Sequence, residues 1–82
     1  METIKVEIER KGLEVDMDRE AFALALKTWR IRSGKTQEEV GQMFNCSRYS
    51  ILRIEKALPI SWRMAYRVFA NLAEELRKEG QR

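Results

Sequence analysis

The 82-residue sequence contains no histidine, one cysteine and one proline. Without histidine, the chain has neither a histidine-cysteine zinc site nor a nucleophile activated by a histidine base. Its single cysteine, Cys46, forms no internal disulfide. No apolar run approaches the roughly 20 residues that span a bilayer, and the alternating charges of the N-terminal residues are unlike a signal peptide. We therefore expect a cytoplasmic protein with no membrane segment, metal, cofactor or enzymatic activity.

Charge is distributed unevenly along the chain. The net charge of +3 divides into −3 over residues 1–18, with six acids and three bases, and +6 over residues 19–82, with thirteen bases and seven acids. A basic body with an acidic N-terminal segment indicates a polyanionic partner that meets only the body. The same charges also suit an ordinary solvated surface, so charge alone does not decide between the two.

The first 18 residues have the pattern of a β-hairpin. Apolar and polar side chains alternate with a period of two over residues 4–8 and again over 13–17. The Lys-Gly pair at 11–12 predicts a two-residue turn, because glycine adopts the positive φ that such a turn requires. This turn pairs Ile8 with Val15 and places all the apolar side chains on one face. An isolated hairpin is marginal in water, so we expect this face to pack against the rest of the chain.

Capping residues divide the remainder into four predicted helices. Asp18, Thr36 and Ser47 are suitable N-caps, and Thr36 with Glu39 forms a capping box. Gly34 matches the left-handed position just after a helix. The predicted helices run from Arg19 to about Ser33, from after Thr36 to about Phe44, from after Ser47, and from Ile60 or Ser61 to about Lys78, with Pro59 marking the last break.

The side chains expected in the core recur at helical spacing. In chain order they are Phe22, Ala25, Leu26, Trp29, Val40, Met43, Phe44, Ile51, Ile54, Trp62, Ala65, Tyr66, Phe69, Leu72, Ala73 and Leu76. Cys46, in the turn between two helices, is expected to be buried and unreactive. The predicted fold is a single mainly α domain over residues 1–82. Its parts are an N-terminal β-hairpin (1–18), three helices (19–57) and a long C-terminal helix (58–82).

The segment from Arg30 to Glu55 carries the most information about function. It contains two short capped helices joined by a tight turn, which is the pattern of a helix-turn-helix. The second of these helices turns Ile51 and Ile54 inward. Its opposite face then carries Arg48, Tyr49, Leu52 and Arg53. Such a face is unusual for a helix that binds nothing.

This segment resembles the lambda-repressor-like helix-turn-helix family of phage repressors, Cro proteins and many bacterial regulators. T-Q-E-E-V-G at 36–41 is similar to the family's usual [ST]-Q-E-E-L-A, and S-R-Y-S-I-L-R-I-E at 47–55 is similar to its recognition helix, usually S-x-x-[ST]-I-S-x-[IL]-E. The resemblance implies that Arg30 pairs with Glu55 and that Gln37 contacts the DNA backbone. It implies sequence-specific binding of double-stranded DNA by a transcriptional regulator such as a repressor.

The chain also departs from the family pattern. Gly41 replaces the usual alanine, and Lys35 replaces an apolar residue. Lys56-Ala57 stands where the family has Asn-Gly. Residues 1–20 and 58–82 lie outside the resemblance, so the family's dimer geometry does not carry over to this chain.

The predicted interface places the helix after Ser47 in the major groove. Base contacts are expected from Arg48, Tyr49, Leu52 and Arg53, and backbone contacts from Lys35, Gln37, Ser47 and Lys56. Arginine is suited to these base contacts because its guanidinium bonds guanine O6 and N7 together. The simpler alternatives are that the arginines are solvated, that Tyr49 packs, that Leu52 is a stray exposed apolar side chain, and that Ser47 serves only as a cap.

Two other functions remain open. A protein-interaction module, such as an antitoxin or adaptor, would use the same fold and bind through the hairpin and the last helix. RNA binding is the weaker alternative, because the glycine and aromatic signatures of common RNA-binding modules are missing. Since one helix-turn-helix reads only about half a site, we also expect a homodimer through the hairpin or the last helix. A monomer whose hairpin covers its own helices is the alternative.

Overall fold

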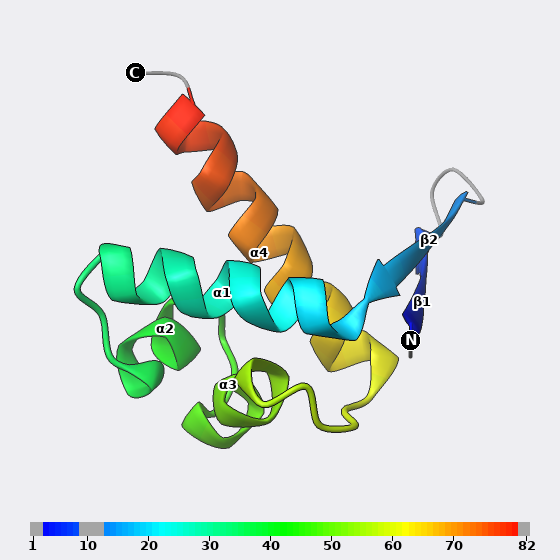
Figure 1. Cartoon of the computed structure of the whole chain (residues 1–82), viewed down its shortest axis with the longest axis horizontal. Coiled ribbons are helices and arrows are strands. Elements are labelled where there is room, and N and C mark those ends of the chain that lie inside the picture. The colour runs from blue at the N-terminus through cyan, green and yellow to red at the C-terminus, as the bar shows by residue number, and fades with distance from the viewer. Residues whose placement is uncertain (1–2, 9–12, 81–82) are drawn as a thin grey trace.

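The computed structural model describes residues 3–8 and 13–80, and the side chains of residues 18–80 (Figure 1). Within these residues, the chain is mainly helical and has four helices, as predicted. They are α1 (Arg19–Arg32), α2 (Gln37–Met43), α3 (Arg48–Glu55) and α4 (Trp62–Gly80). None of the described helices is both long enough and apolar enough to cross a membrane.

Two antiparallel strands, β1 (Thr3–Ile8) and β2 (Leu13–Asp18), precede α1. Ile8 lies opposite Leu13, whereas the sequence-based register paired Ile8 with Val15, so the predicted register is wrong by two residues. Leu13 is paired with Ile8, with four residues in the connection between them, instead of with Arg10 across a two-residue turn. Because the shift is even, it preserves which residues share a face. The predicted turn at 11–12 lies outside the described residues.

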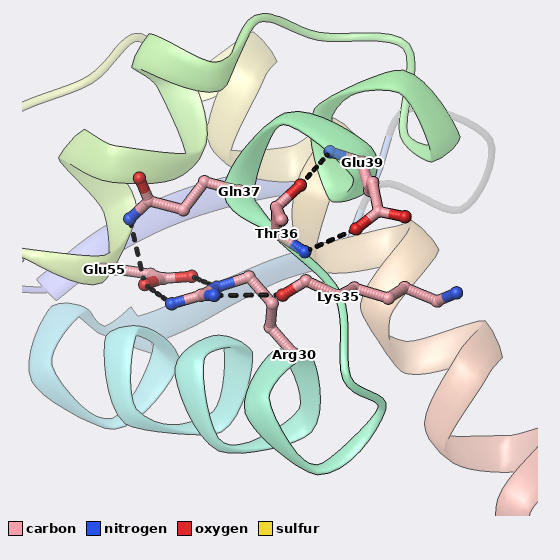
Figure 2. A network of polar contacts seen from close by, with 6 residues as sticks. All are labelled: Arg30, Lys35, Thr36, Gln37, Glu39 and Glu55. Carbon is pink, nitrogen blue, oxygen red and sulfur yellow. Dashed lines mark hydrogen bonds and ion pairs between the residues drawn. The ribbon is translucent and has the colours of Figure 1, made fainter.

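The N-terminal caps of α1, α2 and α3 follow the sequence-based prediction. Oδ1 of Asp18 accepts a hydrogen bond from the Glu20 N–H at 3.0 Å. In the capping box of α2, Thr36 Oγ1 accepts from the Glu39 N–H at 3.0 Å, and Glu39 Oε1 accepts from the Thr36 N–H at 2.9 Å (Figure 2). Ser47 caps α3 in the same way as Asp18 caps α1. These bonds satisfy N–H groups that have no partner inside a helix.

The C-terminal ends of α1, α2 and α3 share one geometry. The residue after each helix cap has a positive φ: 69° at Gly34, 57° at Asn45 and 56° at Ala57. The next N–H in each case donates back to a carbonyl in the last turn, namely Lys35 to Arg30 O, Cys46 to Gly41 O and Leu58 to Arg53 O. This is the Schellman motif. Gly34 suits it, while alanine in this region is strained because its Cβ approaches the carbonyl oxygen.

Ten buried side chains contributed by all four helices form the core. They are Phe22, Leu26, Trp29, Val40, Phe44, Ile51, Ile54, Ala65, Val68 and Leu72. Trp29 stacks on Phe44 with the ring centroids 5.5 Å apart, which fastens α1 to the end of α2. α3 packs against α1, α2 and α4, and this contact fixes its orientation in the molecule.

The predicted core is wrong in several places. Met43, Trp62 and Leu76 are 44%, 45% and 39% exposed, and Ala25 and Ala73 are also exposed. Ala23 and Val68 are buried in their place. The apolar stripe of α4 is wide, and only its centre meets the other helices. The C-terminal turns of α4 diverge from α1 (Figure 1) and meet its end through the exposed Arg32–Glu79 ion pair instead of through apolar packing.

Cys46 is half-buried instead of fully buried as predicted. Desolvation raises the pKa of its thiol, which is the largest effect on this group. The nearby charge of Arg67 acts in the opposite direction. Because the thiolate is the nucleophile, a raised pKa makes this side chain less reactive at neutral pH.

Candidate nucleic-acid interface

The turn between α2 and α3 brings the two helices into close contact. A Cβ added at Gly41 would lie 2.8 Å from the carbonyl oxygen of Cys46 and 3.2 Å from the N–H nitrogen of Arg48. The missing side chain at this position therefore allows the approach. On the other side, Nη1 of Arg67 in α4 donates to the Asn45 carbonyl at 2.9 Å. The turn therefore contacts both α2 and α4, and these contacts fix the position of α3.

α3 has a buried face and an exposed face. Ile51 and Ile54 are 0% and 3% exposed and anchor the helix in the core. Across the helix, Arg48 is exposed and Tyr49 is 54% exposed. The remaining two predicted base-contacting residues, Leu52 and Arg53, are only partly exposed. The structure thus places all four side chains away from the buried isoleucines, but it leaves only Arg48 and Tyr49 widely open to solvent.

Arg53 makes contacts that the sequence-based analysis did not anticipate. Its Nε and Nη2 donate to the carbonyl oxygen of Pro59 at 2.9 and 2.6 Å. Its Nη1 donates to the hydroxyl of Tyr49 at 3.0 Å, and its guanidinium carbon lies 5.4 Å from the centre of the Tyr49 ring. All three guanidinium nitrogens are therefore engaged within the protein.

Behind α3, Arg30 and Glu55 form the ion pair implied by the family resemblance (Figure 2). Arg30 Nε and Nη2 donate to the two carboxylate oxygens of Glu55 at 2.6 and 2.9 Å, and Nη1 donates to the Lys35 carbonyl at 3.1 Å. The two side chains are 15% and 4% exposed. The hydrogen bond to Glu55 raises the pKa of Arg30. This pair joins α1 to the end of α3 and to the loop before α2.

Gln37 lies at the first turn of α2, beside this ion pair. Its Nε2 donates to Glu55 Oε1 at 3.3 Å, and its amide oxygen points away from the carboxylate (Figure 2). A carboxamide carries two N–H donors. One N–H of Gln37 is thus directed inward to Glu55, which holds the side chain in place, and the second donor and the oxygen are available to a ligand.

The other three predicted backbone-contacting residues lie in different places. Ser47 caps α3 and adjoins Arg48. Lys56 is exposed at the C-terminal cap of α3, next to Leu24 and Lys27 of α1. The side chain of Lys35 points away from Gln37 and lines a groove between the ends of α1 and α4 (Figure 2). The structure therefore does not bring Lys35 together with the α3 face.

All but one of the charged side chains of α3 and the first half of α4 are basic. Residues 40–73 contain five basic side chains and a single carboxylate, Glu55, which is engaged by Arg30. Two of the five, Arg63 and Arg67, lie on α4 and were not singled out from the sequence. The guanidinium carbon of Arg63 lies 5.5 Å from the centre of the half-exposed Trp62 ring. The long interval with a single acid was the sequence signal that could have revealed them.

No protein-family model, curated protein or solved structure matches this chain. Its function therefore has to be inferred from the geometry of α2 and α3 and from the charges around them. A rigidly supported helix with an exposed arginine and tyrosine, next to an interval of 34 residues with one neutralised carboxylate, is an arrangement that attracts a polyanion.

Proposed function

We propose that the chain is a helix-turn-helix domain that binds double-stranded DNA in a sequence-specific manner, as a transcriptional regulator similar to the lambda-repressor-like family. In this proposal α2 and α3 form the motif, α3 enters the major groove, and β1 and β2 form a hairpin added to the motif. The observation that carries the proposal is the exposed face of α3. Arg48 and Tyr49 project from a helix whose opposite face is anchored by buried isoleucines.

The charges near α3 support this assignment. An acidic side chain on the recognition helix would repel the phosphates, and the one acid within residues 40–73, Glu55, is already paired with Arg30, although Glu20 of α1 lines the same hollow as Lys56. Arg48 is the residue suited to a guanine edge, and Leu52 is suited to a thymine methyl group. We propose phosphate contacts for Gln37, Ser47 and Lys56, and we omit Lys35 because its side chain lies on the α4 side of α1.

Selection of bound duplexes from a random library tests the proposal. We expect one short motif to be enriched, and the affinity to fall steeply as salt rises, because binding releases counterions. Arg48→Ala should weaken discrimination at one base pair by about 1–3 kcal/mol. The matched control is Arg32→Ala, which removes the same charge from α1, where Arg32 pairs with Glu79 instead of lying on α3. A library without any enriched motif would contradict the proposal.

A protein-interaction module is the second candidate, and the exposure of apolar side chains on α4 favours it. Trp62 and Leu76 are 45% and 39% exposed, although both lie on a helix whose centre is buried. An adaptor or antitoxin would bind little bulk DNA at any salt concentration, so the salt titration separates the two candidates.

We also propose that the chain forms a homodimer through the hairpin or α4, since two copies would read two half-sites about 34 Å apart. Sedimentation at micromolar concentration measures the oligomeric state. Deletion of residues 1–17 should give monomers if the hairpin is the interface, and should leave dimers if α4 is. A full-length monomer that protects a single half-site would exclude the dimer.

A further inference from the structure

The contacts of Arg53 differ from those expected of a residue that reads a base. A base-reading arginine needs two N–H groups free to meet guanine O6 and N7. In this structure Nε and Nη2 both donate to the Pro59 carbonyl oxygen, and Nη1 donates to the Tyr49 hydroxyl. These bonds use three of the five guanidinium N–H groups and hold the guanidinium against the loop between α3 and α4.

These contacts determine the role of the Tyr49 hydroxyl. Arginine has only donors and no acceptor, so the hydroxyl oxygen must accept the hydrogen bond from Nη1. The hydroxyl proton then points away from Arg53 and can be donated to a hydrogen-bond acceptor. A bond received from a charged donor also strengthens the bond that the hydroxyl donates, because successive hydrogen bonds polarise one another. Tyr49 is 54% exposed, and Arg48, the residue before it on α3, is also exposed.

We infer that Arg53 is a positioning residue, and that Tyr49 is the specificity-determining residue, donating its hydroxyl proton to an acceptor atom on a base edge in the major groove. The inference rests on the proposed DNA binding and replaces the sequence-based assignment of Arg53 as a base contact. Guanine N7 and O6, adenine N7 and thymine O4 are the acceptors available there. Arg53 acts through Tyr49 by setting the ring position and by occupying one acceptor site of the hydroxyl, which leaves its proton to be donated to the base.

The test compares Tyr49→Phe, Arg53→Ala and the double variant on duplexes that differ at one base pair each. Tyr49→Phe should reduce preference roughly tenfold at one base pair, the loss of a single hydrogen bond. Arg53→Ala should reduce preference at that same base pair, and the double variant should show no further loss. Arg48→Ala, the independent control, should reduce preference at another base pair.

A conservative variant separates the position of the guanidinium from its charge. Arg53→Lys keeps the charge but has one nitrogen where arginine uses three. We expect it to retain affinity for bulk DNA while losing the preference that Tyr49→Phe loses. Melting curves accompany each variant, and Tyr49→Phe, which leaves the Arg53–Pro59 contacts intact, serves if Arg53→Ala does not fold.

Three results would overturn the inference. If Arg53→Ala abolishes preference at a base pair that Tyr49→Phe leaves intact, Arg53 itself reads the base, and the proposed DNA binding stands. If Tyr49→Phe weakens binding to every duplex equally, Tyr49 contacts a phosphate. If the unaltered protein enriches no motif from the library, the proposed function and this inference fail together.

Discussion

Removal of the Glu55 carboxylate should destabilise the protein far more than removal of an exposed carboxylate. Glu55 is 4% exposed and accepts hydrogen bonds from Arg30 Nε, Arg30 Nη2 and Gln37 Nε2. In Glu55→Ala, the Arg30 guanidinium, which is 15% exposed in the parent protein, loses both bonds to Glu55 and retains its bond to the Lys35 carbonyl. Loss of one partner from a buried ion pair costs about 3–5 kcal/mol.

The size of the effect follows from the remaining exposure of Arg30. Because this side chain keeps some contact with water and one hydrogen bond, we expect the lower end of the range, about 3 kcal/mol. For a domain of this size, 1 kcal/mol corresponds to a shift in Tm of roughly 4–8 °C. Glu55→Ala should therefore lower Tm by roughly 12–24 °C.

The matched control is Glu79→Ala, which removes the partner of Arg32. This pair also joins α1 to another helix, with its nearest atoms 2.5 Å apart, but its side chains are 56% and 34% exposed. Exposed pairs contribute about 0–1 kcal/mol, so Tm should change by a few degrees at most. Addition of 1 M salt should weaken the Arg32 contribution and leave the Arg30 contribution nearly unchanged, because buried pairs are screened less.

Thermal and urea unfolding followed by circular dichroism measure these differences. Equal melting temperatures for Glu55→Ala and Glu79→Ala would refute the reasoning, because they would mean that the Arg30–Glu55 pair is exposed in solution. The packing of the end of α3 against α1 would then differ from the structure.

Three further substitutions test local features of the fold. Ala57→Gly should stabilise the protein by about 1 kcal/mol, because glycine adopts the positive φ of 56° without the strain that alanine has there. The same change at exposed Ala70, inside α4, should destabilise the protein by about 1 kcal/mol. The midpoints of urea unfolding compare the two variants. Gly41→Ala should reduce the stability by about 1–3 kcal/mol, since the added Cβ would lie 2.8 Å from the Cys46 carbonyl oxygen. Gly80→Ala is the neutral control, because a Cβ at Gly80 would have nothing within 4 Å. Equal Tm values for the two variants would contradict the tight turn. Hydrogen bonding from the Thr36 backbone N–H, and then from the Thr36 side chain, lowers the pKa of Glu39 below its ordinary value of 4.5. The Glu39 carboxylate therefore contributes to stability above pH 4.5, and this contribution is lost as the pH falls through the lowered pKa. The difference in stability between the parent and Glu39→Gln should shrink in an acid titration. A constant difference would argue against the capping box.

Local features of the fold could be predicted from the sequence because they depend on residues within a few positions of each other. Asp18, Thr36 and Ser47 cap the helices through bonds to N–H groups two or three residues away. Gly34 ends α1 because glycine adopts the left-handed conformation easily. Ala57 adopts the same conformation without any sequence signal, since its backbone is held by the Schellman bonds and by the packing of α3.

Which apolar side chains are buried was decided by the tertiary structure. The spacing on α4 predicts a face that includes Trp62 and Leu76, but burial depends on how far the neighbouring helices reach along it. Val68 belongs to the core and is 0% exposed, whereas Leu76 lies near the end of α4, where the contact with α1 is an ion pair, and is 39% exposed. Helical periodicity specifies the direction of a side chain, but it carries no information about how closely the neighbouring helices approach that side chain.

The candidate site also has features that the sequence predicts and features that depend on the tertiary structure. The outward direction of Arg48 and Tyr49 follows from the positions of Ile51 and Ile54 on one helix, which the sequence alone determines. The Arg30–Glu55 pair spans 25 positions and was anticipated only through a family resemblance. The engagement of Arg53 with Pro59 depends on the path of the loop after α3, which local sequence does not specify, because a carbonyl becomes available to a side chain only once the chain has folded back to it.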